Sequence, residues 1–119
     1  MPRITIASAK AKGRNLQKWV AEKISELTGL PHGKDCPIES RPMGQSGTDV
    51  RLDNQAKALF PFAVECKAQE SWSVHGWVEQ AEKNASVTEP WILFCKRSRK
   101  PPVVIMDAEV FFEILRKGK

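Results

Sequence analysis

The sequence contains few of the residues from which disulfide frameworks and structural zinc sites are built. Its three cysteines, Cys36, Cys66 and Cys95, lie far apart and form no CxxC pair. A disulfide scaffold or a structural zinc site is therefore not expected. His32 lies four residues before Cys36, but the only other histidine, His75, is distant, and we interpret His32 and Cys36 as loop residues.

Long apolar runs are also lacking. No stretch approaches the roughly 20 consecutive apolar residues that cross a bilayer, and residues 1–14 lack the apolar segment of a secretory signal. We expect an intracellular protein with no membrane partner. A length of 119 residues suits one domain over residues 1–119. A domain of this size buries roughly two-thirds of its unfolded surface, so a real core is available.

Positive charge exceeds negative charge, with 19 Lys and Arg against 14 Asp and Glu, which gives a net charge of +5. Such an excess attracts polyanions, of which nucleic acids are the commonest, although solubility alone also accounts for it. The basic residues gather in two groups, and this clustering favours contacts with phosphates. The groups are Lys10, Lys12, Arg14 and Lys18, and then Lys96, Arg97, Arg99 and Lys100.

Hydrophobic periodicity predicts helices and strands along most of the chain. Apolar residues at helical spacing predict a helix from Asn15 to Leu27, ended by Gly29. A second helix is predicted over Val74–Ala85, and a third after Asp107, a good N-cap. In the third helix, Ala108, Phe111, Phe112 and Leu115 are expected to face the core.

Strand patterns occupy the segments between these helices. A short strand is predicted near Ile38–Met43, followed by a loop at residues 44–47. Two further strands, Thr48–Asp53 and Leu59–Lys67, are joined by a turn at residues 54–57 and should pair as a hairpin. Trp91–Lys96 and Val103–Met106 complete the set. This order predicts an α/β (α+β) fold with a central mixed β-sheet flanked by helices.

The tryptophans divide into two kinds by their surroundings in the sequence. Trp19, Trp77 and Trp91 lie on apolar patterns and are expected in the core, as are Cys66 and Cys95. Trp72 lies in a polar connection and is the tryptophan we expect at a DNA or partner surface, where it could stack on bases.

The stretch PFAVECK, residues 61–67, begins as a buried strand and ends in opposite charges. Alternate strand residues share a face, so Glu65 and Lys67 lie together, and hairpin pairing could bring Asp49 beside them. Two adjacent carboxylates repel each other, and a hard cation such as Mg²⁺, which prefers oxygen ligands, removes that cost. Lys67 could then hold an attacking water or neutralise charge on a phosphate. The alternative is an exposed charge pair contributing well under about 1 kcal/mol.

The segment Gly-Thr-Asp-Val, followed by a hairpin and Val-Glu-Cys-Lys, resembles the PD-(D/E)XK nuclease superfamily. The layout from Lys12-Gly13-Arg14 onward is similar to its small Holliday-junction-resolvase-like branch, and most similar to bacteriophage endonucleases of that type. The resemblance implies a restriction-endonuclease-like core and Mg²⁺, which Mn²⁺ can replace. It also implies hydrolysis that leaves a 5′-phosphate, homodimers, and the cytoplasm of a bacterial host.

Carried over by residue, the resemblance makes Asp49 and Glu65 the metal-binding acids, with the backbone carbonyl of Cys66 as a further ligand. Lys67 matches the catalytic lysine of the motif. Thr48 stands where the motif has proline, which changes the local backbone but no ligand. Gln17 stands where such resolvases often carry a glutamate on the first helix, which puts a second metal ion in doubt.

Gln17 is nevertheless our candidate for the helical contribution to the site. On a helical wheel of about 100° per residue, Gln17 falls at the border of the apolar stripe, whereas Glu22 falls on the solvent side. An ordinary boundary glutamine is the alternative. Gln69 and Gln80 follow the motif strand and could contact the DNA backbone or a metal-bound water, or could be surface residues.

These residues together predict a metal-dependent DNA endonuclease that selects branched DNA, with the two basic groups holding phosphates. Phosphate contacts position a protein without reading sequence, which suits a junction. One alternative is a nuclease that nicks linear or flapped duplex. The other is a basic nucleic-acid-binding module of the same fold that does not cleave.

Overall fold

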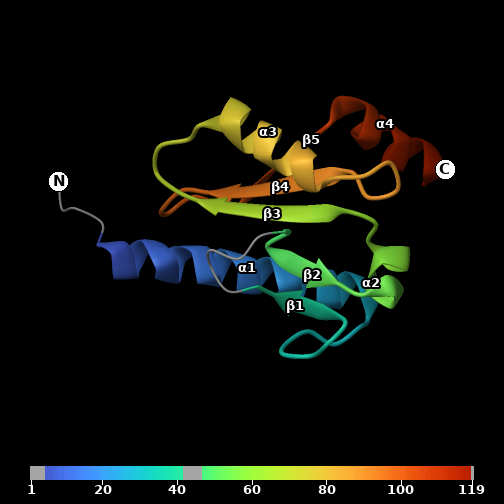
Figure 1. Ribbon diagram of the computed structural model, residues 1–119, viewed down its shortest axis with the longest axis horizontal. Coiled ribbons are helices and arrows are strands. Elements are labelled where there is room, and N and C mark those ends of the chain that lie inside the picture. Colours follow the sequence, from blue (N-terminus) through green and yellow to red (C-terminus); the bar gives the residue numbers. More distant parts are fainter. Residues whose placement is uncertain (1–4, 42–46, 119) are drawn as a thin grey trace.

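A five-stranded mixed sheet forms the centre of the molecule (Figure 1). The computed structural model describes residues 5–41 and 47–118. The strands are β1 (Ile38–Ser40), β2 (Val50–Leu52), β3 (Ala63–Ala68), β4 (Trp91–Lys96) and β5 (Val103–Met106), in that spatial order. The β3–β4 pair is parallel, and the other pairs are antiparallel. The predicted mixed sheet is confirmed.

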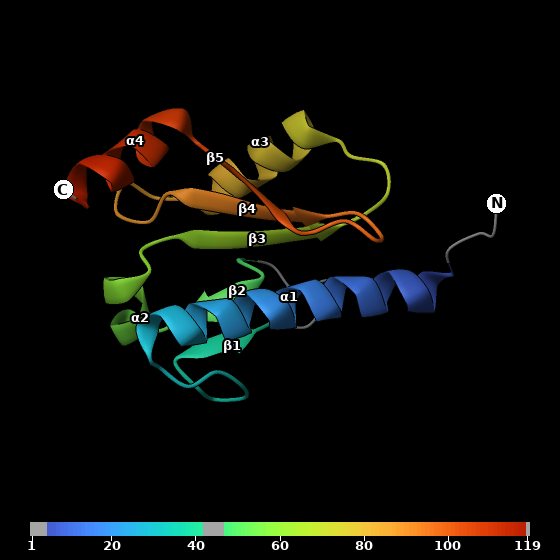
Figure 2. The same ribbon diagram turned by 180° about the vertical axis from the view of Figure 1, so that it is seen from behind.

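Helices cover both faces of this sheet, as the view from behind also shows (Figure 2). They are α1 (Ile6–Thr28), α2 (Asn54–Leu59), α3 (Val74–Asn84) and α4 (Ala108–Lys117). On one face, Leu16, Val20 and Ile24 of α1 pack against Val64 of β3 and Ile92 of β4. On the other face, α3 packs on β3 and β4. There Trp77 of α3 packs with Leu93 and Cys95, and Trp72 and Trp91 lie around them.

The first helix begins nine residues earlier than predicted, at Ile6 instead of Asn15. The Thr5 hydroxyl caps it by accepting a hydrogen bond from the Ser8 backbone N–H at 3.0 Å. The first turns are exposed, so they carry no apolar stripe from which a helix could be predicted. The predicted end is confirmed, because Gly29 is the C-cap with φ of 75°, a left-handed conformation that favours glycine.

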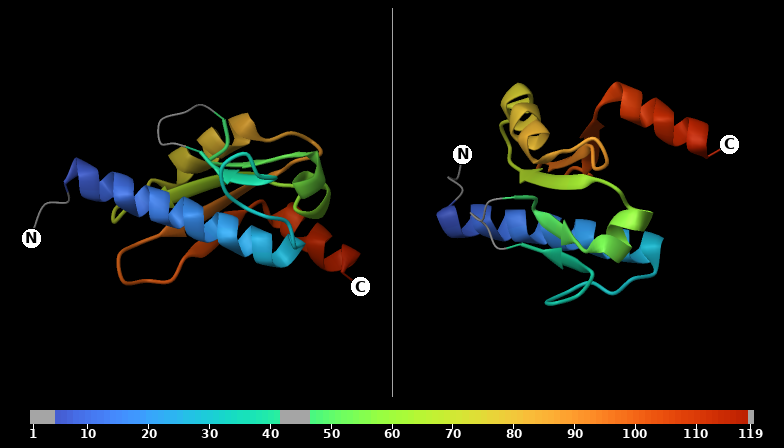
Figure 3. Two further views of the ribbon diagram at one scale, coloured as in Figure 1. Left: turned by 90° about the horizontal axis from the view of Figure 1, so that it is seen from below. Right: turned by 45° about the vertical axis from the view of Figure 1, so that its right-hand side comes forward.

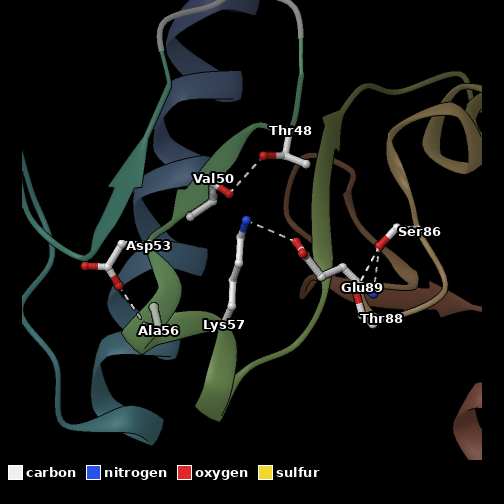
Figure 4. Close-up of polar contacts among 8 residues, drawn as sticks. All are labelled: Thr48, Val50, Asp53, Ala56, Lys57, Ser86, Thr88 and Glu89. Carbon is white, nitrogen blue, oxygen red and sulfur yellow. Dashed lines mark hydrogen bonds and ion pairs between the residues drawn. The ribbon is translucent and has the colours of Figure 1, made fainter.

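The segment between β2 and β3 is a short helix, α2, where the sequence predicted a turn. The Asp53 carboxylate caps α2 by accepting from the Ala56 backbone N–H at 2.9 Å (Figure 4). Lys57 of α2 forms an ion pair of 3.3 Å with Glu89, which precedes β4. The predicted β2–β3 pairing is present, but its ladder contains one residue pair, Val50 with Val64. The two strands therefore separate soon after they meet.

The first two predicted strands are shorter than expected. β1 ends at Ser40, and Arg41 follows it outside any strand. The last two residues of the predicted range, with most of the loop at residues 44–47, lie outside the described residues. The strands β4 and β5 have the predicted bounds.

The last helix and one tryptophan differ from the predicted core. α4 begins after the predicted N-cap Asp107 but has no buried residue, and it extends outward from the body beyond β5 (Figure 3). Phe111, Phe112 and Leu115 are each about half exposed, because none of the helices and strands in residues 5–41 and 47–118 covers the apolar stripe that suggested burial. Trp19, also expected in the core, is 38% exposed.

Trp72, expected at a surface, is half-buried. Its indole N–H donates to the Gln69 carbonyl at 2.8 Å, and its ring lies 6.0 Å from that of Trp77. Cys95 is buried, as predicted, and Cys66 packs against the α1 side of the core. None of the helices in the described ranges combines the length and the apolar character that a membrane crossing requires.

Candidate functional site

The site is built where β2 and β3 separate. Asp49 immediately precedes β2, and its backbone N–H donates to the Val64 carbonyl at 2.9 Å. Its carboxylate then accepts a hydrogen bond from the Cys66 backbone N–H at 2.7 Å. A backbone N–H inside a protein needs a partner, and here a side chain takes the role of a neighbouring strand. This bond fixes the Asp49 carboxylate against β3.

Glu65 is the buried acid of the site, with 4% of its surface exposed. Its carboxylate accepts from the Asn84 side-chain amide of α3 at 2.6 Å. Burial, and after it the adjacent Asp49 carboxylate, raise the pKa of Glu65 to about 7. The Asn84 bond and the charge of Lys67 oppose these effects. The predicted meeting of the two acids is therefore present in the fold.

Lys67 lies two residues beyond Glu65, on the same face of β3 and beneath α3. Its ammonium donates to the Gln80 carboxamide at 3.0 Å and lies 6.0 Å from the centre of the Trp77 ring. Gln80 and Asn84 are four residues apart, so both project from one side of α3. One helix face thus holds Lys67 through Gln80 and Glu65 through Asn84.

The oxygen donors suit a hard cation. Among the residues the structure describes, no three His, Cys, Asp or Glu side chains gather as a ligand set for a metal. A cation here would have two carboxylates, completed by backbone carbonyl, water or phosphate oxygens, as is usual for Mg²⁺. Burial raises the pKa of the Cys66 thiol well above its ordinary value, so Cys66 could contribute its carbonyl oxygen but not a thiolate.

Comparison with known protein families gives a match for the chain as a whole. The model of the family described as "phage putative PDDEXK endonuclease" matches residues 8–118. The chain belongs to this family of PD-(D/E)XK phage endonucleases. Nucleases of this superfamily act on DNA and generally use divalent metal ions. No match was found among curated proteins or among solved structures.

In this phage endonuclease, Thr48 stands in place of the motif proline. Its hydroxyl donates to the Val50 carbonyl at 3.3 Å, beside the start of β2 (Figure 4). Gln17, expected at the border of α1, is buried among its apolar residues with 3% exposure. The hydrogen bonds described above bring Cys66, Asn84 and Gln80 to the three motif residues. Gln17 contributes to none of these bonds.

The two basic groups of the endonuclease meet in space. Lys12 of α1 donates to the Ser98 hydroxyl in the turn after β4 at 2.6 Å, although the residues are 86 apart in the sequence. Lys10, Arg14, Lys18, Arg97, Arg99 and Lys100 are exposed, and Lys12 and Lys96 are half-buried. The two groups are therefore adjacent at this contact, and we call their eight residues together the basic surface.

Sequence reasoning missed Asn84 and gave Gln80 only a general polar role. Their spacing of four residues on a predicted helix was the available signal. Nothing in the sequence indicated that this helix lies over Glu65 and Lys67, because that placement depends on the crossover from β3 to β4.

Proposed function

We propose that this chain is a Mg²⁺-dependent DNA endonuclease that selects branched DNA and hydrolyses phosphodiester bonds at Asp49, Glu65 and Lys67. The observation that carries the proposal is the Asp49 carboxylate fixed beside the buried Glu65, with the Lys67 ammonium on the same face. Family membership supports the reaction class.

The metal would be held by Asp49, Glu65 and the backbone carbonyl of Cys66, and Mn²⁺ could replace Mg²⁺. The chemistry of the donors fits, because two adjacent carboxylates, one of them buried, need a positive charge between them. When bound, such an ion activates water and stabilises charge on the phosphate.

The protein's own residues would orient this chemistry. The Cys66 N–H and the Asn84 amide hold the two carboxylates in place. Gln80 holds the Lys67 ammonium, which would bind the attacking water or the charge that develops on the phosphate. Gln17 stays a proposed contributor on the ground of the sequence resemblance, although α1 packs on the face of the sheet opposite Glu65 and Lys67. Being neutral, its carboxamide would orient a water and would not favour a second cation.

The substrate would be double-stranded DNA with a branch, bound through phosphates by the basic surface. Contacts of this kind do not read sequence, so selectivity must come from DNA shape. We also propose a homodimer, with one site for each of two strands. The uncovered apolar side chains of α4 and β5 support a self-association surface.

A cleavage assay tests the function. The wild-type protein and Lys67→Ala are incubated with a four-way junction, a flapped duplex and a linear duplex, in Mg²⁺ or in EDTA. We expect junction cleavage in Mg²⁺ alone and a loss of at least about 100-fold in Lys67→Ala. Lys83→Ala is the matched control, since Lys83 is exposed on the same helix that covers the site.

Each other outcome has a defined meaning. Cleavage that survives both EDTA and Lys67→Ala would refute the mechanism. Preference for linear or flapped duplex would replace junction selection with nicking. Tight DNA binding with no cleavage of any substrate would favour a non-catalytic binding module.

A further inference from the structure

A cavity of about 330 Å³ lies between α1, the end of β3 and the turn after β4. Its volume is at the lower end of the range of ligand pockets, about 300–1,000 Å³. It lies on the α1 side of the sheet, whereas Glu65 and Lys67 lie on the α3 side. It is therefore a different place from the site described above.

The walls of the cavity are apolar and include one indole. Leu16 and Trp19 come from α1, Ala68 from the end of β3, and Pro102 from the segment before β5. Trp19 is 38% exposed, and the Lys23 ammonium lies over its ring at 5.5 Å. A partly exposed indole beside a cavity offers a stacking surface, and a base stacked on an aromatic ring contributes about 1–3 kcal/mol.

The rim of the cavity is charged and held together by hydrogen bonds. Lys12 donates to the Ser98 hydroxyl, and the Ser98 backbone N–H donates to the Glu70 carboxylate at 2.8 Å. These two bonds tie α1 to the segment after β3 through the turn after β4. They fix the shape of the opening between elements that are distant in sequence.

The rim carries three cations, Lys12, Lys96 and Arg97, and one carboxylate, Glu70. The Ser98 N–H lowers the pKa of Glu70, as do the neighbouring Lys12 and Arg97 charges. Glu70 is therefore ionised at neutral pH and repels an anion placed beside it. A phosphate would instead bind at Lys96 and Arg97, and Glu70 could accept from N–H groups on the edge of a base.

We propose that this cavity binds one unpaired nucleotide of the DNA substrate, with its base stacked on Trp19 and its phosphate on Lys96 and Arg97. The proposal rests on the proposed endonuclease function. It specifies that the protein recognises branched DNA by an unpaired nucleotide. An apolar slot with an indole and a cationic rim suits a base that has left the duplex stack. A fully paired duplex presents no base that can enter it.

The cavity and the site lie on opposite faces of β3, a few residues apart along the strand. Ala68 is three residues beyond Glu65 on β3, which is about 10 Å at the usual rise per residue. That is about three base steps of B-form DNA. A strand that passes around the carboxyl end of β3 could place an unpaired base in the cavity a few nucleotides from the bond at Glu65.

The test measures binding in EDTA, so that it does not depend on cleavage. A duplex with a single bulged 2-aminopurine is compared with the fully paired duplex, using wild type, Trp19→Leu, Trp19→Phe and Arg97→Ala. Leu27→Ala is the control, because Leu27 is an exposed apolar residue of the same helix and is not among the cavity residues. Circular dichroism checks the fold, and Trp19→Phe retains an aromatic ring if Trp19→Leu unfolds.

We expect wild type to quench the fluorescence of the bulged base and to prefer the bulged duplex. Trp19→Leu should lower affinity for the bulge about tenfold, with less than about a twofold change for paired duplex. Trp19→Phe should retain part of the preference, Arg97→Ala should weaken bulge binding, and Leu27→Ala should match wild type. An unchanged bulge preference in the Trp19 variants would overturn the proposal.

Two further experiments distinguish this proposal from a mononucleotide site and from the endonuclease function itself. If free deoxyadenosine monophosphate displaces the bulged duplex as effectively as a competing bulged duplex does, the cavity is a mononucleotide site and the proposal fails. Cleavage with Mg²⁺ but no Trp19-dependent bulge preference refutes the cavity alone. A Trp19-dependent preference without any cleavage supports the cavity and refutes the endonuclease function.

Discussion

Glu65 is the residue whose chemistry depends most on its surroundings. In water it would be ionised at neutral pH, but its burial and the adjacent Asp49 raise its pKa to about 7. In the unfolded chain, the pKa of Glu65 has its ordinary value of 4.5. Without metal, Glu65 therefore binds a proton more tightly in the folded chain than in the unfolded chain. This stabilisation is complete below pH 4.5 and is lost as pH rises through 7.

We expect the free energy of unfolding in EDTA to fall by about 2–3 kcal/mol between pH 4.5 and pH 8, relative to Glu65→Gln. Urea unfolding at a series of pH values measures this difference, and the glutamine variant removes the titration of Glu65 alone. Added Mg²⁺ should stabilise the wild type more at pH 8 than at pH 5, because protons compete for the same carboxylate. A pH dependence identical in both proteins would contradict the burial argument.

Asn84 should act on metal binding through Glu65. Asn84→Ala removes the amide that lowers the pKa of Glu65, so the pKa should rise further and Mg²⁺ affinity at pH 7 should fall about tenfold. Calorimetric titration with Mg²⁺ measures the affinity, and repeating it at pH 8.5 should recover much of the loss. Asn54→Ala, at an exposed position of α2, is the control. A loss of equal size at both pH values would mean that Asn84 does not act through the titration of Glu65.

At the scale of elements, the sequence was most informative where local pattern and tertiary surroundings agree. Strands β4 and β5 were predicted with their observed bounds because continuous apolar runs are enclosed by proline and polar turns. The first turns of α1 carry no apolar stripe, so they were missed. α4 was predicted as a helix but placed in the core, because periodicity shows that a face is apolar and not what covers it.

The candidate site, too, could be predicted only where local sequence pattern decides the contact. The meeting of Asp49 and Glu65 could be predicted because strand alternation fixes the face and hairpin pairing brings β2 to β3. The contacts from Gln80 and Asn84 could not, because they depend on where the crossover helix α3 lies. The Lys12–Ser98 bond joins residues that only the complete fold brings together.

The basic surface formed by α1 and the turn after β4 should act as one electrostatic unit. If Lys12 and Arg97 each contact a phosphate, each alanine variant should reduce the slope of log K against log salt by about 1, and the double variant by about 2. Fluorescence anisotropy with linear duplex over a salt series measures this slope. Lys34→Ala is the control, because Lys34 is an exposed lysine of the loop before β1, and its substitution removes one positive charge outside the basic surface. An equal change in the Lys34 variant would indicate only a net-charge effect.

At the scale of the whole molecule, apolar side chains of α4 and β5 are exposed in the part of the chain that the structure describes. The edge strand β5 exposes Val103 and Val104, and α4 exposes Phe112, Ile114 and Leu115. An isolated ten-residue helix is marginal in water, and exposed apolar patches of this kind mark interaction sites. An edge strand can also pair with another chain. These features together favour a partner at the α4–β5 surface.

A second copy of the chain suits this surface by charge. Glu109 lies in the first turn of α4, and Arg116 and Lys117 lie in its last turn. Glu113, in the middle of the helix, is paired with Arg116 at 2.6 Å. When two α4 helices pack antiparallel about a two-fold axis, the acidic part of each meets the basic part of the other, as an isologous interface requires. A standard interface buries about 800 Å² on each partner. The β5 edge strands of the two copies would contribute part of this buried area.

We therefore expect sedimentation equilibrium to show a wild-type dimer at micromolar concentration and a monomer for Phe112→Ser with Leu115→Ser. Ile6→Ser is the control, because Ile6 is exposed at the first residue of α1, and α1 starts at the opposite end of the molecule from α4 (Figure 1). Glu109→Lys alone should weaken the dimer by placing like charges together, and adding Lys117→Glu should restore it, since the exchange reverses both ends of an antiparallel pair. Such rescue would not follow if α4 merely needed its apolar residues to fold. A monomeric wild type, or a dimer unaffected by the serine variants, would exclude this surface as the interface.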